Sequence, residues 1–422
     1  MCTMASCRSL ICPGSDVPMT ETLHPENEDQ LLDALKWAVS ARAPLNVIGL
    51  GSKATLGQSV QIEQALDLSA LSGILHYEPS ELVLTARAGT PLNHIQQALA
   101  ENNQEMAFEP VNLGAVLSND ETAKGSIGGL IAGGFAGPRR IRQGSVRDHM
   151  LGFRAISGRG ELFKSGGKVM KNVTGFDLSK LMTGSMGTLA IMSEVSIKVL
   201  PVPEKSRTVL VYGLSDEDAV AAMRLAVNSP HEVSSAAHLP AAIAARSGVD
   251  LVAGAGSGVT AIRVEGPGPS VEARCASLQK SLSPFGTLEE LHSQRSTQFW
   301  AEVRDAGYWS STDVSIWRLS VPPSRGADIA STIMQQCGGE ALFDWGGGLI
   351  WLAVEDGHQD AIRSALSGVD GHATLVRGVE ATRQSANVFQ PQPAPLAALS
   401  TRVKTAFDPY GILNPGRLYP VA

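Results

Sequence analysis

Apolar and polar residues follow a helical repeat in some segments of this chain and a strand repeat in others. Residues 26–41 place leucine, tryptophan and valine on one side of a 3.6-residue repeat, which predicts an amphipathic helix ended by Pro44. A second helix is expected over residues 91–101, with Thr90 as its cap. Short apolar runs bounded by turn residues predict strands at 45–48, 82–88, 150–156, 161–163 and 189–199. The first half therefore alternates helix and strand, which indicates an α+β fold.

The pattern changes after Pro201, where glycine becomes less crowded. Apolar runs predict further strands at 208–212, 259–264, 315–320 and 349–354. Helical repeats predict helices at 216–228, 271–281, 326–336 and 359–367. Strands and helices in this order favour a smaller sheet with helices on one face, and no internal repeat is evident.

The chain is too long for one ordinary core, so we expect several structural units. A leader rich in serine, proline and threonine comes first and is expected to be disordered. Near the end, a Pro- and Gln-rich linker at 389–395 precedes a last helix at 396–407. The predicted units are a leader at 1–22, a first domain at 23–203, a middle domain at 204–385 and a C-terminal segment at 386–422.

Composition narrows the function classes. With 43% apolar and 18% charged residues the chain has the make-up of a globular protein, and no apolar run reaches the roughly 20 residues of a membrane helix. A net charge of −7 argues against nucleic acid or an anionic membrane as partner, since clustered lysine and arginine hold those. Five cysteines without a CxxC pair argue against disulfides or an iron–sulfur cluster. The leader is a poor secretory signal, so we expect a cytoplasmic protein.

Glycine is the unusual residue, because many of its 43 copies crowd into short loops between positions 49 and 187. The first loop follows the predicted strand at 45–48, and its residues are Ile48, Gly49, Leu50, Gly51, Ser52 and Lys53. Glycines here let backbone N–H groups point at a phosphate. An ordinary turn between two strands explains this loop equally well.

A second glycine loop, expected over residues 125–137, is followed by Arg139, Arg140, Arg142 and Arg147. Its candidate binding residues are Gly125, Ser126, Ile127, Gly128, Gly129 and Gly134. Small residues leave a flat backbone surface for a planar or pyrophosphate ligand, and an arginine beyond them can pair with an anion. Packing of two elements explains Gly128 and Gly129, but it does not readily explain six glycines with four arginines.

Two later segments complete the candidate site. Its remaining residues are Gly144, Ser145 and Asp148, and then, after a polar loop at 171–181, Gly184, Gly187, Thr188, Ala190 and Ile191. Three glycine loops in one domain are harder to explain by packing than one. The run at 254–259 lacks the last glycine of the dinucleotide fingerprint, and the P-loop pattern fails around Lys168, so neither NAD nor ATP has a recognisable site. Nine histidines without HxH, HxxxH or HExxH spacing predict no metal site.

These loops, in this order, resemble the FAD-linked oxidases of the vanillyl-alcohol oxidase type. The resemblance covers residues 23–422 and rests on the segments 49–53, 125–134, 144–148, 172–181 and 184–191. Within that superfamily the chain is similar to the FAD-binding E subunits of bacterial glycolate oxidase. This narrower resemblance rests on the segments 49–53, 56–57, 316–322, 345–347 and 407–417.

The resemblance implies a PCMH-type FAD-binding domain of two subdomains, a ferredoxin-like α+β cap, and a C-terminal segment that returns to the FAD domain. In such a fold the loops at 49–53 and 125–129 would hold the pyrophosphate and the flavin edge. Gly144, Ser145 and Asp148 would lie along the ribityl and adenosine side, and residues 187–191 would approach FAD through their backbone. Relatives that bind flavin covalently carry histidine or cysteine in these loops, so FAD is expected to be non-covalent here.

The implied function is that of a subunit in a glycolate oxidase complex, in which a 2-hydroxy acid such as glycolate passes a hydride from carbon 2 to flavin and becomes glyoxylate. The implied partners are a D-type flavoprotein subunit and an iron–sulfur subunit, and any membrane association would be made through them. Related dehydrogenases carry a histidine-rich metal and substrate motif, which this sequence lacks. The alternative is an FAD-binding electron-relay or structural subunit without its own substrate site.

No catalytic base is assigned from the sequence. Lys171, Asn172 and Arg139 fall near the flavin in motif order, but each could equally bind cofactor or stabilise a loop. A third hypothesis is a subunit without flavin, in which the glycine loops serve packing alone.

Overall fold

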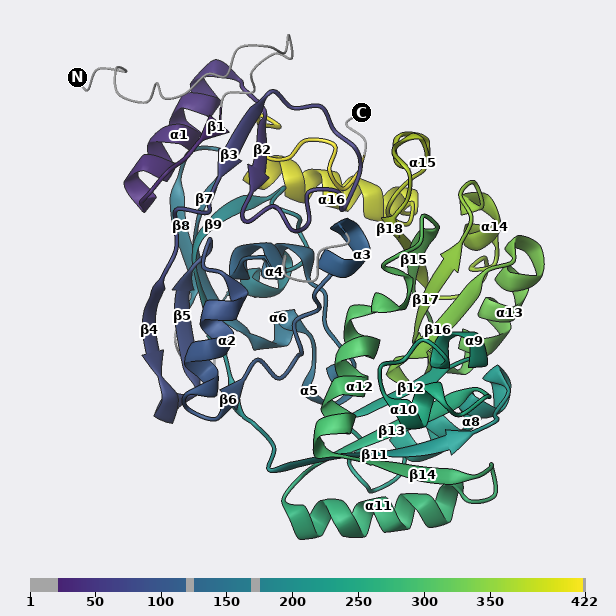
Figure 1. Cartoon of the computed structure of the whole chain (residues 1–422). Helices are drawn as coiled ribbons and strands as arrows, with labels where there is room; N and C mark the ends of the chain where they lie inside the picture. Colours follow the sequence, from purple (N-terminus) through teal and green to yellow (C-terminus); the bar gives the residue numbers. More distant parts are fainter. Residues whose placement is uncertain (1–21, 119–124, 168–174, 420–422) are drawn as a thin grey trace, which may run out of the picture.

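The computed structural model of the chain describes residues 22–118, 125–167 and 175–419. The predicted leader up to residue 21 and the candidates Lys171 and Asn172 lie outside them. Figure 1 shows two lobes. The N-terminal lobe holds the sheets of residues 22–201 together with residues 394–419, and the C-terminal lobe is built around an eight-stranded sheet between residues 205 and 377.

A small parallel sheet begins the N-terminal lobe. Its strand order is β1 (Thr22–Leu23), β3 (Gln64–Asp67) and β2 (Leu45–Ile48). Helix α1 (Glu28–Ala41) starts at the side-chain cap Asn27. Its apolar stripe of Leu31, Leu35 and Ala38 is buried in the same core as the apolar residues of this sheet. The first predicted helix and strand are confirmed.

A five-stranded antiparallel sheet forms the second part of the lobe. Its order is β4 (Ile74–Glu78), β5 (Val83–Arg87), β9 (Ala190–Lys198), β7 (Met150–Ser157) and β8 (Leu162–Gly166). Strands β7 and β8 pair as the predicted hairpin. The helices of this part are α2 (Leu92–Ala100), α3 (Gly114–Ser118), α4 (Ile127–Gly133), α5 (Arg140–Gln143), α6 (Val146–His149) and α7 (Leu178–Met182). A short pair consists of β6 (Gln104–Glu105) and β10 (Leu200–Pro201).

The glycine-rich stretch at 125–137 is not the continuous loop that its composition predicts, because residues 127–133 form helix α4. The hydroxyl oxygen of Ser126 accepts the N–H of Gly129 and caps the helix. Leu130 and Ile131 are buried in the core under the five-stranded sheet. Capping and burial together outweigh the low helix propensity of glycine.

The predicted cap of helix α2 is also wrong. Pro91 occupies the position before the helix, and its side chain makes no capping bond. The Thr90 hydroxyl instead donates to the carbonyl oxygen of Arg87 over 2.6 Å, so it stabilises the turn that precedes α2. Proline is common at a helix start because its fixed φ suits the first turn.

The sheet of the C-terminal lobe is antiparallel throughout its eight strands. Its order is β14 (Leu288–His292), β11 (Lys205–Tyr212), β13 (Val259–Gly266), β12 (Ser235–Leu239), β16 (Glu340–Asp344), β17 (Leu349–Val354), β15 (Ser315–Ser320) and β18 (His372–Arg377). Its helices are α8 (Asp216–Val227), α9 (Ala241–Ala244), α10 (Asp250–Ala253), α11 (Gly268–Leu282), α12 (Ser293–Asp305), α13 (Gly326–Cys337), α14 (Gln359–Ser364) and α15 (Glu380–Ser385). The α+β class is confirmed.

Two ferredoxin-like units make up this sheet. The first runs β11, α8, β12, β13, α11, β14, and the second runs β15, α13, β16, β17, α14, β18. Each has the βαββαβ order, and the strands of each unit lie side by side in the order fourth, first, third, second. The units join where His238 on β12 pairs with Phe343 on β16. The sheet is therefore larger than its predicted strands suggest, and the fold contains a repeat that the sequence does not reveal.

The two faces of the eight-stranded sheet have different neighbours. Helices α8, α11, α13 and α14 share one core with one face, in line with the predicted helical layer. The opposite face packs against α12 and against residues of the N-terminal lobe, among them Val111 and Phe135. Figure 1 shows α12 between the lobes. This second face is where the lobes can form a shared site.

The C-terminal residues return to the N-terminal lobe. Helix α16 (Ala394–Phe407) places the ring of Phe407 6.0 Å from that of Phe163 on β8. Beyond it, the backbone N–H of Leu45 donates to Ile412, and that of Asn414 donates to Leu45. The tail thus runs beside β2 and the first glycine loop.

Candidate cofactor-binding site

A cavity of about 80 Å³ lies where β2, helix α4 and the start of β9 meet. Residues from all three predicted glycine loops line it. They are Ile48, Gly49, Ser126, Gly128, Gly129, Gly187, Ala190 and Ile191. The lining also includes Val47, Leu68, Ala88, Ala132, Met186, Met192 and Asn414, which were not among the predicted site residues. Sequence segments more than a hundred residues apart therefore form one mostly apolar slot.

The first two glycine loops touch at positions that exclude side chains. A Cβ atom on Gly49 would lie 2.5 Å from the Ser126 hydroxyl oxygen. Gly125 has a φ of +80°, and a Cβ atom there would collide with the Ser52 hydroxyl. The two loops therefore touch directly, with little room for a side chain at either position.

The glycines in helix α4 have different surroundings, and some of them are required for packing. A Cβ atom on Gly128 would lie 2.8 Å from the carbonyl oxygen of Ala88, so this glycine lets α4 pack closely on the residues after β5. Gly129 has more room, because its nearest neighbour would be the Ser126 hydroxyl at 3.4 Å. Ile127 is fully buried in the core and does not line the cavity.

The third loop contributes backbone and small residues. Gly187 has a φ of +68°, and a Cβ atom on it would lie 2.9 Å from the side-chain nitrogen of Asn414. Gly134 and Gly184 adjoin each other, since a Cβ atom on Gly134 would lie 3.2 Å from the backbone of Gly184. Thr188 is buried beside the cavity, and its hydroxyl donates to the carbonyl oxygen of Ser185.

Asn414 was missed as a site residue, although the terminal segment 407–417 contributes to the family resemblance. Its side-chain oxygen accepts the N–H of Val47 over 2.7 Å, and its side-chain nitrogen donates to the carbonyl oxygen of Met186 over 2.8 Å. Asn414 therefore ties β2 to the third loop at the cavity wall. Only its position in that terminal motif could have indicated it.

Lys53 lies at the junction of the first two loops. Its ammonium is 3.5 Å from the Ser52 hydroxyl and forms no ion pair with any residue that the structure describes. Burial lowers the pKa of Lys53 to about 8. A partly buried cation next to two glycine loops is suited to a phosphate or another anion.

Arg417 fixes the far end of the first loop. Its guanidinium donates to the carbonyl oxygens of Lys53 and Ala54 over 3.0 and 2.8 Å. Burial, followed by the nearby Arg383, lowers the pKa of Arg417 to about 10. The C-terminal segment thus sets the shape of the loop that carries Gly51, whose φ of +74° favours glycine. Neither Gly51 nor the exposed Leu50 lines the cavity.

Gly144, Ser145 and Asp148 lie outside the cavity lining. Asp148 accepts the backbone N–H and the hydroxyl of Ser145, which forms a capping box at the start of α6. Gly144 has a φ of +82° and leads into this turn. The described contacts of these residues are local.

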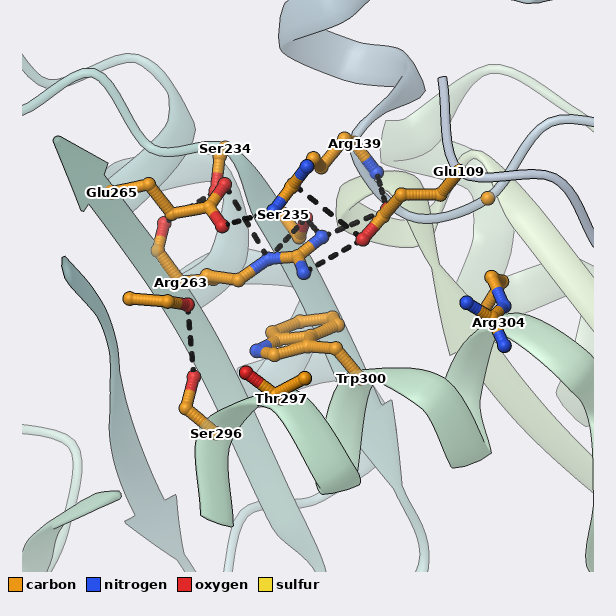
Figure 2. Close-up of polar contacts among 12 residues, drawn as sticks. Glu109, Arg139, Ser234, Ser235, Arg263, Glu265, Ser296, Thr297, Trp300 and Arg304 are labelled. Carbon is orange, nitrogen blue, oxygen red and sulfur yellow. Dashed lines mark hydrogen bonds and ion pairs between the residues drawn. The ribbon is translucent and has the colours of Figure 1, made fainter. Parts of the chain in front are cut away.

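Arg139, the first arginine after the second loop, belongs to an ion-pair network that Figure 2 shows. Arg139 donates to Glu265 over 2.6 Å and also pairs with Glu105, while Arg263 donates to both carboxylate oxygens of Glu109 over 2.8 and 2.9 Å. Glu105, Glu109 and Arg139 belong to the N-terminal lobe, whereas Arg263 and Glu265 are on β13. Arg139 thus belongs to the contact between the lobes, a role that differs from both of those considered from the sequence.

A larger cavity of about 430 Å³ lies between α2 and α12. Its polar lining includes Arg246, Glu302, Arg304 and Asp305, and no predicted site residue lines it. In the described ranges no three metal-ligating side chains come together, and no helix there is long and apolar enough to cross a membrane.

Comparisons with known proteins identify the fold and the family. The FAD binding domain family model matches residues 21–166. Glycolate oxidase subunit GlcE of Escherichia coli (strain K12) is 36% identical over 392 residues, which cover 92% of this chain and 96% of that protein. Glycolate oxidase subunit GlcD of Bacillus subtilis (strain 168) is 28% identical over 188 residues, covering 44% of this chain and 38% of that protein.

A solved structure of p-cresol methylhydroxylase with substrate bound is similar to this chain, with a TM-score of 0.72 and 14% identity. The match covers 94% of this chain and 88% of the p-cresol methylhydroxylase chain. At this identity the likeness concerns the fold, which is the predicted PCMH type. The GlcE match extends over nearly the whole of both chains. The protein therefore belongs to the family of the glycolate oxidase subunit GlcE, and its cofactor is FAD.

Proposed function

We propose that this chain is the FAD-binding subunit of a complex that oxidises glycolate, or a similar short 2-hydroxy acid, to the 2-oxo acid. One observation carries the proposal. Gly49, Gly129 and Gly187 come from three separate glycine-rich segments and line a single cavity. The glycolate oxidase subunit GlcE, a relative of nearly the same length, supports the choice of substrate.

The cavity and its surroundings suggest how FAD is held. The loops at 49–53 and 125–129 would hold the pyrophosphate, and Lys53, which forms no ion pair among the described residues, would supply a positive charge beside it. Gly187, Ala190 and Ile191 line the same slot. FAD is bound without a covalent link, since no histidine or cysteine stands in residues 48–53 or 144–148. Gly144, Ser145 and Asp148 support the adenosine side through the α6 turn.

The reaction removes a hydride from carbon 2 of the 2-hydroxy acid and a proton from its hydroxyl group. When bound, FAD would accept the hydride, the proton would be released to solvent, and this chain would orient the substrate. The electrons then leave to a D-type flavoprotein subunit and an iron–sulfur subunit. The GlcD match over 44% of this chain is consistent with a second, related flavoprotein in the complex. A cytoplasmic location, with membrane association only through these partners, goes with this assembly.

The chain divides, in this proposal, into a leader at 1–22, an FAD domain at 23–203, a cap at 204–385 and a returning segment at 386–422. The change from the β6–β10 pair to the eight-stranded sheet between Pro201 and Lys205 supports the second boundary. The hydrogen bonds between Leu45 and the tail support the return of the last segment.

The decisive experiment is anaerobic mixing of the FAD-loaded protein with glycolate, followed by the visible absorbance of oxidised flavin. We expect bleaching and the formation of one glyoxylate for each flavin reduced. Bleaching only in the assembled complex, and only of the partner's flavin, would favour the alternative of an electron-relay or structural subunit. If glycolate bleaches no flavin in either preparation, the proposal fails. Acid precipitation tests the non-covalent link, because FAD should then appear in the supernatant.

A further inference from the structure

Arg318 on β15, the strand next to the edge strand β18, points at the N-terminal lobe. Its strand neighbours Trp317 and Leu319 belong to the helix-covered core, whereas Ile316 belongs to the interlobe core. The period of two along a strand therefore directs the Arg318 side chain toward the other lobe. Trp351 lies directly opposite it on β17.

Aromatic rings surround this guanidinium. Its central carbon lies 4.9 Å from the ring centre of Trp345, 5.3 Å from that of Phe135 and 5.9 Å from that of Trp351. The three rings are nearly inaccessible to solvent. The rings contact the guanidinium through cation–π interactions. These interactions do not use its N–H groups, which can therefore donate to a hydrogen-bonding partner.

A second guanidinium shares one of these rings. Arg140 on α5 lies over Trp345 with its central carbon 4.4 Å from the ring centre. Neither Arg140 nor Arg318 donates a side-chain hydrogen bond or forms an ion pair with any residue in the described part of the chain. Two cations thus lie close together without a carboxylate between them, an arrangement that an anion would stabilise.

Two carboxyl groups act on the charges of these arginines, and neither pairs with them: Asp148 acts on Arg140 but accepts the hydrogen bonds of Ser145, and Asp344 acts on Arg318. Asp344 ends β16 and accepts the N–H of Trp345 over 2.7 Å. Burial raises the pKa of Asp344 to about 8, so the group is largely protonated at neutral pH. Burial, followed by Arg140, lowers the pKa of Arg318 to about 10, and Arg318 remains a cation there. The local charge at Trp345 is therefore positive.

This pair of arginines adjoins the proposed FAD site. A Cβ atom on Gly133 would lie 3.3 Å from the Phe135 ring and 3.5 Å from the side chain of Lys53. Gly133 ends the helix whose start lines the cavity, and Phe135 is one wall around Arg318. Gly133 thus lies between Lys53 and the Phe135 ring beside Arg318, so the proposed FAD site and the two arginines are neighbours.

We propose that Arg318, assisted by Arg140, binds the carboxylate of the 2-hydroxy acid. A carboxylate matches the planar N–H edge of a guanidinium in a bidentate pair. The walls formed by Phe135, Trp345 and Trp351 favour acids with short side chains. This inference rests on the proposed function, and it places the substrate site in this chain rather than in a partner.

The test uses the FAD-loaded full-length protein and oxalate, a small dicarboxylate without a hydrogen on carbon to transfer. Oxalate binding is followed by its perturbation of the flavin absorption spectrum. We expect Arg318→Gln to weaken oxalate binding about tenfold or more, since a charge-assisted pair is lost. Arg140→Gln should have a smaller effect because Arg140 is more exposed. Arg402→Gln, an exposed arginine on α16, serves as the matched control and should leave binding unchanged.

Three results would overturn the inference. The first is oxalate binding that Arg318→Gln leaves unchanged. The second is an equal weakening of a neutral analogue, glycolamide, which would indicate lost shape and not lost charge. The third is loss of FAD from both Arg318→Gln and the charge-conserving Arg318→Lys, which would assign the arginine to the cofactor or the fold.

The same measurements separate this inference from the proposed function. If oxalate binds through Arg318 but glycolate never bleaches the flavin, the anion site stands and the glycolate activity fails. If glycolate bleaches the wild-type flavin and the Arg318→Gln flavin at the same rate and KM, the activity stands and the carboxylate site fails.

Discussion

Each ferredoxin-like unit of the C-terminal lobe has an arginine over a tryptophan ring at the face toward the N-terminal lobe, and the surroundings of these two arginines differ. Arg263 on β13 lies 4.7 Å over the ring of Trp300, and Arg318 on β15 lies 4.9 Å over that of Trp345. Arg263 makes two hydrogen bonds to Glu109, whereas Arg318 has no carboxylate partner in the described ranges. The two arginines thus have the same kind of aromatic neighbour, but among the described residues only Arg263 is paired with a carboxylate of the other lobe.

The difference separates an arginine that holds the two lobes together from one that can bind a ligand. A buried guanidinium whose N–H groups are already paired has nothing left to offer a ligand, and breaking the pair leaves an uncompensated charge. An unpaired guanidinium in an aromatic cage keeps its donors for an anion. We therefore interpret the end of the interface at Arg263 as the structural joint, and the end at Arg318 as the end open to chemistry.

The largest expected effect comes from breaking the joint. Glu109→Gln should lower the free energy of unfolding by about 3 kcal/mol, because Arg139 and Arg263 remain buried with one carboxylate fewer. Chemical denaturation of the FAD-loaded chain measures this loss. Glu272→Gln, which breaks an exposed pair with Arg207, is the control and should change stability by less than about 0.5 kcal/mol. If Glu109→Gln and Glu272→Gln lowered the free energy of unfolding equally, the pair at Glu109 would contribute no more than a surface pair.

Asp344 sharpens the comparison, since both Arg263 and Arg318 act on its charge. Its pKa is raised to about 8 in the folded chain from an ordinary value of 3.8, so the folded state binds more protons between these limits. Stability from this group is full below the lower value and is lost as pH rises toward about 8, by at most about 1.4 kcal/mol per pH unit.

Unfolding measurements at several pH values test this group. Asp344→Asn should flatten the loss between about pH 5 and pH 8 and should be more stable than wild type at the upper end. Asp370→Asn, an exposed position, should keep the wild-type slope. A wild-type slope in Asp344→Asn would mean that Asp344 is ionised, and Arg318 would then have a counterion in the protein.

How much of this fold the sequence predicts depends on the range of the forces that set each element. Strands at 45–48, 315–320 and 349–354 have their predicted bounds because apolar runs end at turn residues. Helix α4 was missed because its stability comes from burial of Leu130 and Ile131 and not from local propensity. The doubled ferredoxin-like unit was missed because strand order depends on pairings such as His238 with Phe343, distant in sequence.

Some residues of the candidate site could likewise be predicted from the sequence, and others could not. Gly49, Gly129 and Gly187 could be found because each loop has a local composition unlike its surroundings, and these residues share one cavity. The roles of Arg263 and Glu109 could not be found, because they are separated by 154 positions and have no shared motif. Arg318 stood within the quoted segment 316–322, but only the folded sheet reveals which side of the strand it occupies and that it lacks a partner.

Lys53 extends the comparison to the cofactor, because it is another cation near the site that forms no ion pair within the described residues. Its pKa of about 8 means that it is mostly charged at neutral pH and neutral at higher pH. We expect FAD affinity to fall as pH rises above about 8. Lys53→Met should lower affinity about tenfold at neutral pH and should remove this pH dependence.

Titration of the FAD-depleted protein with FAD, followed by quenching of flavin fluorescence, measures both effects. The exposed Lys164→Met is the matched control and should behave as wild type. If Lys53→Met binds FAD as tightly as wild type at neutral pH, Lys53 does not contact the pyrophosphate.

The smallest expected effect is the stability change in Arg318→Met, and it completes the contrast with Glu109. Replacing Arg318 leaves no carboxylate without a partner, and methionine can fill the space between Phe135 and Trp345. The variant also relieves repulsion with Arg140. We therefore expect a change in the free energy of unfolding within about 1 kcal/mol, measured as for Glu109→Gln. A loss near that of Glu109→Gln would mean that Arg318 holds the lobes together, and the end open to chemistry would have to be sought elsewhere on the interface.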